Sequence, residues 1–182
     1  MIKGLILRSP RAQLRRPVSG DLDALLALDN DPLVMQWLNG GLPVSRHRFE
    51  RDLLPVFLTF NERDLMGFWI AESEGFLGWL SLRPTESDGE AGLGFRFCQA
   101  VWGHGYATEL GKLLISACFA EGGLRRLVAT TYEANVGSQR VLQKLGFNEV
   151  RRYRLAPEDL SDTNIHEGEI WEGEEIEFEC FA

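Results

Sequence analysis

The residues best placed to do chemistry lie in a short turn that contains two glycines. Residues 102–108 read Trp-Gly-His-Gly-Tyr-Ala-Thr, so glycine occupies positions 103 and 105. A strand-like run at 93–97 precedes this turn, and apolar residues at helical spacing follow it. A turn that opens a helix presents unpaired backbone N–H groups at the positive end of the helix dipole. Because Gly103 and Gly105 carry no Cβ, we expect the turn to bind an anion, most naturally a phosphate or pyrophosphate.

A second strand and helix follow this unit. Residues 126–132 are typical of a buried strand, and the segment 135–147 contains a helix. Asn135 suits the position that caps the start of that helix, and Gly146 suits the position just past its end. The chain therefore repeats the order strand, turn and helix, which favours a crossover between neighbouring strands.

Together these two segments resemble the GNAT superfamily of acyl-CoA-dependent N-acetyltransferases. The resemblance rests on residues 102–109, Trp-Gly-His-Gly-Tyr-Ala-Thr-Glu, and on 135–147, and it is nearest to the ribosomal-protein N-terminal (RimJ/RimL-like) type. It implies acetyl-CoA as the cosubstrate and direct attack by a primary amine in a ternary complex. The acceptor would be a protein N-terminal α-amine or a small-molecule amine. Ala100 departs from the family, which often has Arg or Gln where this motif begins.

The resemblance also assigns the cofactor contacts. Backbone N–H groups of the turn would bind the pyrophosphate, with His104 partly exposed beside it. The strand entering the turn would splay from residues 126–132, so that its main chain pairs with the pantetheine arm and thioester. Asn135 would contact the cofactor through its amide, and Arg140 would either reach a CoA phosphate or face solvent. The expected cofactor-binding residues are Phe95, Arg96, Phe97, Trp102, Gly103, His104, Gly105, Tyr106, Ala107, Thr108, Asn135 and Arg140.

The catalytic groups are less clearly marked. Many relatives carry a tyrosine on the second helix as proton donor to the leaving thiolate, and residues 135–145 contain none. Ser138 matches a serine of the ribosomal-type subgroup and would donate this proton, or else act as a local capping partner. Glu90 is the candidate base or acceptor anchor, with Tyr132 and Glu133 as fallback candidates. An α-amine, with a pKa near 7.7–8.0 against about 10.4 for lysine, would need little help from a base.

The amino-acid composition limits the domain organisation, the cysteine chemistry and the location to be expected. At 182 residues, 45% of them hydrophobic and 25% charged, we expect one domain spanning 1–182. Its three cysteines lie far apart and form no metal-binding pattern, so we expect reduced thiols, no metal and a cytoplasmic protein. The N-terminal apolar run is too short for a signal or membrane span. We expect an amine acceptor as partner, neither nucleic acid nor membrane, and leave a homodimer open.

The net charge of −8 is unevenly distributed along the chain. Residues 155–182 hold ten acidic side chains and no Lys or Arg, which leaves 19 basic against 17 acidic residues before them. This segment either steers a cationic acceptor or, as we favour, forms a solvated edge strand and loop.

The elements around these motifs predict a mixed α+β fold. Expected strands lie at 12–17, 66–72, 76–82, 91–97, 126–132, 147–155 and 175–180, and expected helices at 19–30, 32–38, 45–60, 106–121 and 135–145. Pro55 should kink or divide the third helix. The GNAT fold implied by the resemblance is a central, mostly antiparallel twisted sheet with a splayed strand pair and helices on both faces. Trp37, Phe49 and Leu53 would line an acceptor groove or belong to the core.

Two other classes of function are also consistent with the sequence. One is a nucleotide-dependent oxidoreductase, because Gly103-x-Gly105 is part of a dinucleotide fingerprint and Glu133 ends the next strand. Position 108 is Thr rather than the third glycine, which speaks against it. The other is a non-catalytic acyl-CoA sensor, which the missing tyrosine and the lack of a clear base would allow.

Overall fold

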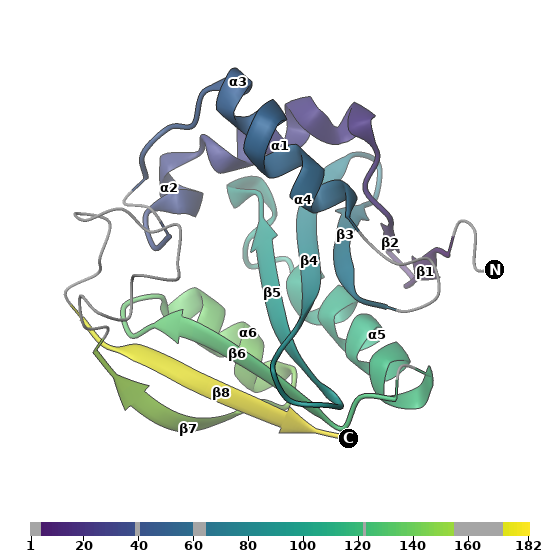
Figure 1. Cartoon of the computed structure of the whole chain (residues 1–182), viewed down its shortest axis with the longest axis vertical. Helices are drawn as coiled ribbons and strands as arrows, with labels where there is room; N and C mark the ends of the chain where they lie inside the picture. The colour runs from purple at the N-terminus through teal and green to yellow at the C-terminus, as the bar shows by residue number, and fades with distance from the viewer. Residues whose placement is uncertain (1–4, 39–40, 60–64, 122, 155–172) are drawn as a thin grey trace.

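A single sheet organises the molecule. The computed structural model describes residues 5–38, 41–59, 65–121, 123–154 and 173–182. In these ranges the sheet has eight strands in the order β1-β2-β3-β4-β5-β6-β8-β7 (Figure 1). The strands are β1 (Leu7–Arg8), β2 (Gln13–Arg15), β3 (Gly67–Glu72), β4 (Phe76–Pro84), β5 (Glu90–Phe97), β6 (Arg126–Tyr132), β7 (Asn148–Tyr153) and β8 (Glu175–Phe181).

Helices cover both faces of this sheet (Figure 1). One face carries α5 (Tyr106–Glu121) and α6 (Val136–Lys144), whose apolar side chains pack with those of β2 to β6 and of β8. The other face carries α1 (Leu22–Asp29), α2 (Pro32–Met35), α3 (Arg46–Arg48) and α4 (Leu54–Leu58). There Leu25 and Phe57 share a second apolar cluster with Ile70 and Trp79 of the sheet. The expected α+β class is confirmed, and each core is built from the alternate side chains of the same strands.

A close contact between α5 and the end of α6 fixes how these two helices meet. Gly111 of α5 faces the side chain of Leu145 at the end of α6, and a Cβ at position 111 would lie 2.8 Å from a Leu145 methyl carbon. No larger residue fits there without repacking. This contact holds the helix that follows the glycine turn against the helix that carries Ser138.

The helical segment expected at 45–60 forms with an irregular centre. Ser45 caps it as the sequence predicts, since its hydroxyl accepts the N–H of Arg48. Between α3 and α4 the chain widens into a π-helical segment, η2 (Phe49–Leu53), and α4 then begins around Pro55. Proline lacks an N–H and its ring crowds the carbonyl four residues earlier, so the widened turn accommodates it. Helix α2 ends at Met35 and is shorter than the predicted 32–38.

Strand β8 corrects the prediction of a solvated edge strand. It lies between β6 and β7 rather than at the edge of the sheet. Its apolar side chains, among them Ile176 and Phe178, are buried as the alternation predicted. Its glutamates are partnered: Glu175 accepts from the Tyr153 hydroxyl, Glu177 pairs with Arg151 and Glu179 pairs with Arg126.

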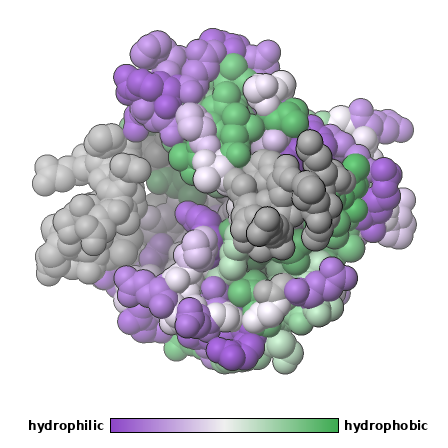
Figure 2. Space-filling view, turned by 45° about the vertical axis from the view of Figure 1, so that its right-hand side comes forward, coloured by the Kyte–Doolittle hydropathy of each residue, from purple (hydrophilic) through white to green (hydrophobic). Residues whose placement is uncertain are grey.

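The surface of the described chain carries both hydrophilic and hydrophobic residues. Figure 2 shows hydrophobic residues reaching the surface between the hydrophilic residues of the upper and lower parts of that face. In the described ranges, no helix combines the length and the apolar character needed to cross a membrane.

Candidate functional site

The glycine turn has the backbone conformation that the sequence predicted. Gly103 and Gly105 have φ values of +77° and +83°, in the region where residues with a Cβ are strained. The preceding residues form a short 3₁₀ turn, η3 (Gln99–Val101). The N–H of Trp102 donates to the carbonyl of Gln99 at 3.1 Å, and the N–H of His104 donates to the carbonyl of Val101 at 3.3 Å. These two amides are therefore engaged inside the turn, contrary to the prediction that they face the ligand.

The remaining amides of the turn are left open. Within the described chain, no acceptor meets the N–H groups of Gly103, Gly105, Tyr106, Ala107 and Thr108. The first regular helical bond of α5 runs from the N–H of Glu109 to the carbonyl of Gly105, at 2.9 Å. A diphosphate offers many acceptor oxygens and a negative charge, so these donors at the helix start fit it. The predicted phosphate site thus narrows to these five residues.

Arg11 supports the turn from a distant part of the chain. Its Nε donates to Glu109 Oε2 at 2.7 Å, and its Nη1 donates to the carbonyl of His104 at 3.1 Å. Its guanidinium also lies 4.6 Å from the centre of the Tyr106 ring. Hydrogen bonds from Ser9 and Arg11 hold the pKa of Glu109 below its usual value, so its carboxylate stays charged. Nothing in the local sequence marks Arg11, because 93 residues separate it from His104.

The side chain of His104 folds back on its own turn. Its Nδ1 lies 3.0 Å from the carbonyl oxygen of Trp102, and the residue is exposed. It therefore sits beside the open amides, in the position expected for a residue near the anion rather than for a base.

The strand that enters the turn parts from its parallel neighbour. β5 and β6 pair only at Glu90 with Arg126, Ala91 with Leu127 and Gly92 with Val128. Beyond Gly92, β5 continues along β4 as far as Phe97, while β6 continues along β8 as far as Tyr132. The splayed pair implied by the resemblance is thus present, and we call the opening beyond Gly92 the wedge.

Alternation along β5 decides which main-chain groups face the wedge. The carbonyl of Gly89 accepts from the N–H of Arg126 at 3.2 Å, whereas the N–H of Cys98 donates to β4 at 2.9 Å. Backbone groups of successive residues turn to opposite neighbours. Phe95 and Phe97 therefore face the wedge, and the Trp102 indole already donates to the Phe97 carbonyl at 2.8 Å. Arg96 is a correction: its main chain faces β4, so it is unsuited to the predicted pantetheine contact.

The side chain of Arg96 has a different role. Its guanidinium pairs with Asp29 at the end of α1 and lies 5.0 Å from the centre of the Trp79 ring. Burial raises the pKa of Asp29, although the charge of Arg96 opposes this change. Among the described residues, the Arg96 Nε is buried without an acceptor. The pair fastens α1 to β5 on the face opposite α5, and no local sequence pattern predicts it.

Ser138 stands at the start of α6 with a free hydroxyl. The Asn135 side chain accepts the N–H of Ser138 at 3.1 Å, so the cap is made by the amide of the serine and not by its hydroxyl. That hydroxyl is half-buried and has no partner in the described chain, which leaves it available to a ligand. The Asn135 oxygen is engaged, whereas its amide nitrogen meets no acceptor among the described residues. Arg140 is exposed on the same helix.

Glu90 lies on the closed side of the strand pair. Its carboxylate accepts from Arg126 at 2.6 Å, and Arg126 also pairs with Glu179 at 2.8 Å. With its carboxylate held by Arg126, Glu90 ties β5 to β6 rather than standing free as the base that the sequence suggested.

The fallback candidates are also engaged in structure. Burial, together with the charge of Glu175, raises the pKa of Tyr132, and Glu133 accepts the N–H of Glu174 at 3.2 Å. Phe49, proposed as part of a groove wall, is fully buried in the core. Among the described residues, no group of three or more His, Cys, Asp or Glu side chains is placed to hold a metal.

Comparison with known proteins gives a family and several relatives. The sequence model of the acetyltransferase (GNAT) domain matches residues 11–148. The FsC-acetyl coenzyme A-N(2)-transacetylase of Aspergillus fumigatus is 30% identical over 156 residues, which are 80% of this chain and 65% of that protein. The chain thus spans slightly less than two thirds of that relative.

Solved structures share the arrangement of the whole chain. RimL, a ribosomal L7/L12 α-N-protein acetyltransferase in complex with coenzyme A, has a TM-score of 0.79 at 17% identity, covering 97% of this chain and 98% of its own. Spermidine N-acetyltransferase from Vibrio cholerae, in complex with CoA and spermine, has a TM-score of 0.73 at 16% identity, covering 95% and 96%. At such identities the likeness concerns the fold alone.

Proposed function

Because this chain belongs to the acetyltransferase (GNAT) family, we propose that it transfers the acetyl group of acetyl-CoA to a primary amine. The observation that carries the proposal is the continuity of two features along one strand. The open amides of the glycine turn begin a few residues after Phe97, and Phe95 and Phe97 face the wedge just before it. A diphosphate bound at the turn would place the pantetheine arm along the free edge of β5 and the thioester in the wedge.

The chemistry then follows from this placement. The amine nitrogen attacks the thioester carbonyl carbon, the carbon–sulfur bond breaks, and the products are an N-acetyl amide and free CoA. The departing thiolate takes a proton, for which the free hydroxyl of Ser138 is our candidate donor. The amine must lose a proton. Of the candidate bases, Glu90 is paired with Arg126 and Glu133 accepts the N–H of Glu174. An α-amine with a pKa near 8 can lose its proton to water, which favours acceptors of low pKa.

Two acceptor classes remain within the proposal. The chain is similar to proteins whose names refer to a protein α-amine, to spermidine and to an N(2) position. We keep both a protein N-terminal α-amine, as in RimJ/RimL-like enzymes, and a small-molecule amine.

A thiol-release assay tests the proposed activity. The purified chain would be mixed with acetyl-CoA and a panel of peptides with varied first residues, amino acids, polyamines and aminoglycosides. Release of CoA with a product heavier by one acetyl group is the expected result. CoA binding without acetyl transfer to any acceptor would contradict the enzyme proposal and favour a sensor. Stabilisation by NAD and not by CoA would favour the oxidoreductase alternative.

A further inference from the structure

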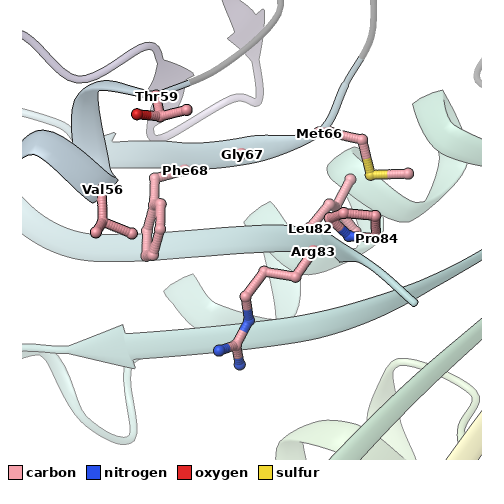
Figure 3. A pocket seen from close by; sticks show the side chains of 8 residues that line it. All are labelled: Val56, Thr59, Met66, Gly67, Phe68, Leu82, Arg83 and Pro84. Carbon is pink, nitrogen blue, oxygen red and sulfur yellow. The ribbon is translucent and has the colours of Figure 1, made fainter. Parts of the chain in front are cut away.

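An apolar cavity opens on the face of the sheet opposite α5 and α6. It has a volume of about 470 Å³ and lies between α4 and the adjoining ends of β3 and β4 (Figure 3). Its wall is largely apolar, and one cationic side chain, Arg83, joins that wall. The apolar residues are Val56, Met66, Phe68, Leu82 and Pro84.

Arg83 connects this cavity to the apex of the wedge. It pairs in register with Gly92 of β5, and Gly92 pairs with Val128 in the last rung before β5 and β6 part. Figure 3 shows the Arg83 side chain leaving the cavity and extending across the neighbouring strand. In the part of the chain that the structure describes, its guanidinium makes no hydrogen bond or ion pair.

The surface of β5 beneath the Arg83 guanidinium is formed by glycine residues. Gly92 and Gly94 lie on this face of β5, and a Cβ at Gly94 would lie 2.8 Å from Ser81 Oγ and 3.6 Å from Arg83 Nη2. Ser81 is fully buried, and its hydroxyl has no partner among the described residues. A Cβ at position 94 would therefore displace the Ser81 hydroxyl and would touch the Arg83 guanidinium in ordinary van der Waals contact. A larger side chain would fill the space along which the arginine lies.

The charged groups on either side of Arg83 already have partners. Glu90 is paired with Arg126 towards the closed end of the strands, and Arg96 is paired with Asp29 towards the turn. Arg83 is thus the cation between these pairs that keeps its full set of donors for a ligand. Guanidinium groups bind carboxylates through two parallel N–H···O bonds, which gives both affinity and orientation.

We infer that the acceptor is an apolar amino acid with a free carboxylate, bound by Arg83, with its side chain in the cavity. This inference rests on the proposed function and names its substrate class. The α-amine is separated from the carboxylate by a single carbon, so binding at Arg83 brings the nucleophile to the wedge. A polyamine has no oxygen for Arg83 and would bring further positive charge beside it.

Matched acceptors test the inference. The ratio of kcat/KM for leucine to that for 3-methylbutylamine, which lacks only the carboxylate, would be measured in the wild type and in variants. We expect Arg83→Gln to reduce this ratio about tenfold or more, while leaving the KM for acetyl-CoA unchanged. Lys112→Gln removes an exposed cation from α5 on the opposite face and should leave the ratio as it is. Comparing ratios cancels the different amine pKa values of the two acceptors.

A second variant and a binding measurement complete the test. Gly94→Val, made together with Ser81→Ala to relieve the contact with the hydroxyl, should reduce the same ratio, because a side chain longer than a Cβ would reach the Arg83 guanidinium. Calorimetry of leucine with the CoA-bound protein reads the carboxylate contact without turnover, and Arg83→Gln should abolish the heat. An unchanged ratio in Arg83→Gln, alongside acetylation of other amines, would overturn the inference and leave the proposed function standing. Leucine binding that depends on Arg83, without acetylation of any amine, would overturn the proposed function and leave only the carboxylate contact at Arg83.

Discussion

At the scale of single residues, the proposed phosphate site would depend on backbone rather than on side chains. The positive φ of Gly103 and Gly105 turns a run of N–H groups outward, and Arg11 secures the turn through the carbonyl of His104. Because the donors belong to the main chain, the site tolerates varied side chains but not a changed backbone. The same logic explains how the site can exist although Ala100 departs from the family pattern.

Replacing Gly105 tests the turn. Gly105→Ala would place a Cβ where φ is +83°, at a cost of about 1–2 kcal/mol, and should weaken CoA binding measured by calorimetry. Gly105→Asp adds a negative charge at the diphosphate and should abolish binding. Gly123→Ala is the matched control, because Gly123 also has a positive φ of 66° but lies beyond the far end of α5. Equal affinity for CoA in the wild type and all three variants would refute the assignment of the glycine turn as the diphosphate site.

Ser138 can be separated from the binding site by kinetics. If its hydroxyl protonates the leaving thiolate, Ser138→Ala should lower kcat by about 100-fold or more with little change in the affinity for acetyl-CoA. Ser116→Ala, on the exposed side of α5, is the control. A variant with wild-type turnover would remove Ser138 from the mechanism, whereas a parallel loss of CoA affinity would make it a binding residue.

At the scale of elements, ion pairs fasten segments that share no local sequence signal. Asp29 at the end of α1 pairs with Arg96 of β5, and Asp21 pairs with Arg15 of β2. The first pair holds the end of α1 over β5, the strand that borders the wedge, and the second holds the start of α1 to β2. Removing one partner leaves the other charge buried and unpaired, which costs more than the pair itself contributes.

The pair between α1 and β5 should be costly to break. Asp29→Ala leaves the guanidinium of Arg96, which is 15% exposed, without its carboxylate, so we expect a loss of about 3–5 kcal/mol in the free energy of unfolding. Urea denaturation would measure it. The double variant Asp29→Leu with Arg96→Leu should recover much of that loss. A single variant as stable as the wild type would show that the pair does not anchor α1.

The pair between Asp21 and Arg15 should make the free energy of unfolding depend on pH. Burial favours the neutral form of Asp21, but hydrogen bonds from Arg15 and the N–H of Val18, with the charge of Arg15, outweigh it and lower the pKa. The stabilisation is therefore present above the ordinary aspartate pKa near 3.9 and disappears as the pH falls through the lowered value. The stability difference between the wild type and Asp21→Asn should be largest at pH 7 and shrink below pH 4. A difference independent of pH would contradict this assignment.

Patterns among neighbouring residues predicted the helices and strands well. They did not predict contacts between residues that lie far apart in the sequence. The glycine turn, the caps at Ser45 and Asn135 and the alternation of β8 depend on neighbouring residues, so the sequence marks them. The wedge came from the family resemblance rather than from any pattern. The pairs of Arg11 with Glu109 and of Arg96 with Asp29 join residues 98 and 67 positions apart, and no local spacing encodes them.

At the scale of the whole molecule, ligand binding should be visible as added stability. A ligand present at 100 times its Kd stabilises the folded state by about 2.7 kcal/mol, which raises Tm by roughly 5–10 °C for a chain of this size. We expect this rise with acetyl-CoA and with CoA, and none with NAD. Gly105→Asp should lose the response while Gly123→Ala keeps it. An equal rise in Gly105→Asp would place the CoA site elsewhere.

The position of β8 has a consequence for biosynthesis. One wall of the wedge, β6, is held on its outer side by β8, although β7 is made first. A growing chain that has reached only residue 153 has every catalytic candidate named above, yet the hydrogen-bonding edge of β6 has no strand beside it. The active enzyme would therefore appear only after residues 175–181 have left the ribosome and inserted between two strands already made. Until then, the bare edge of β6 is open to pairing with another nascent copy.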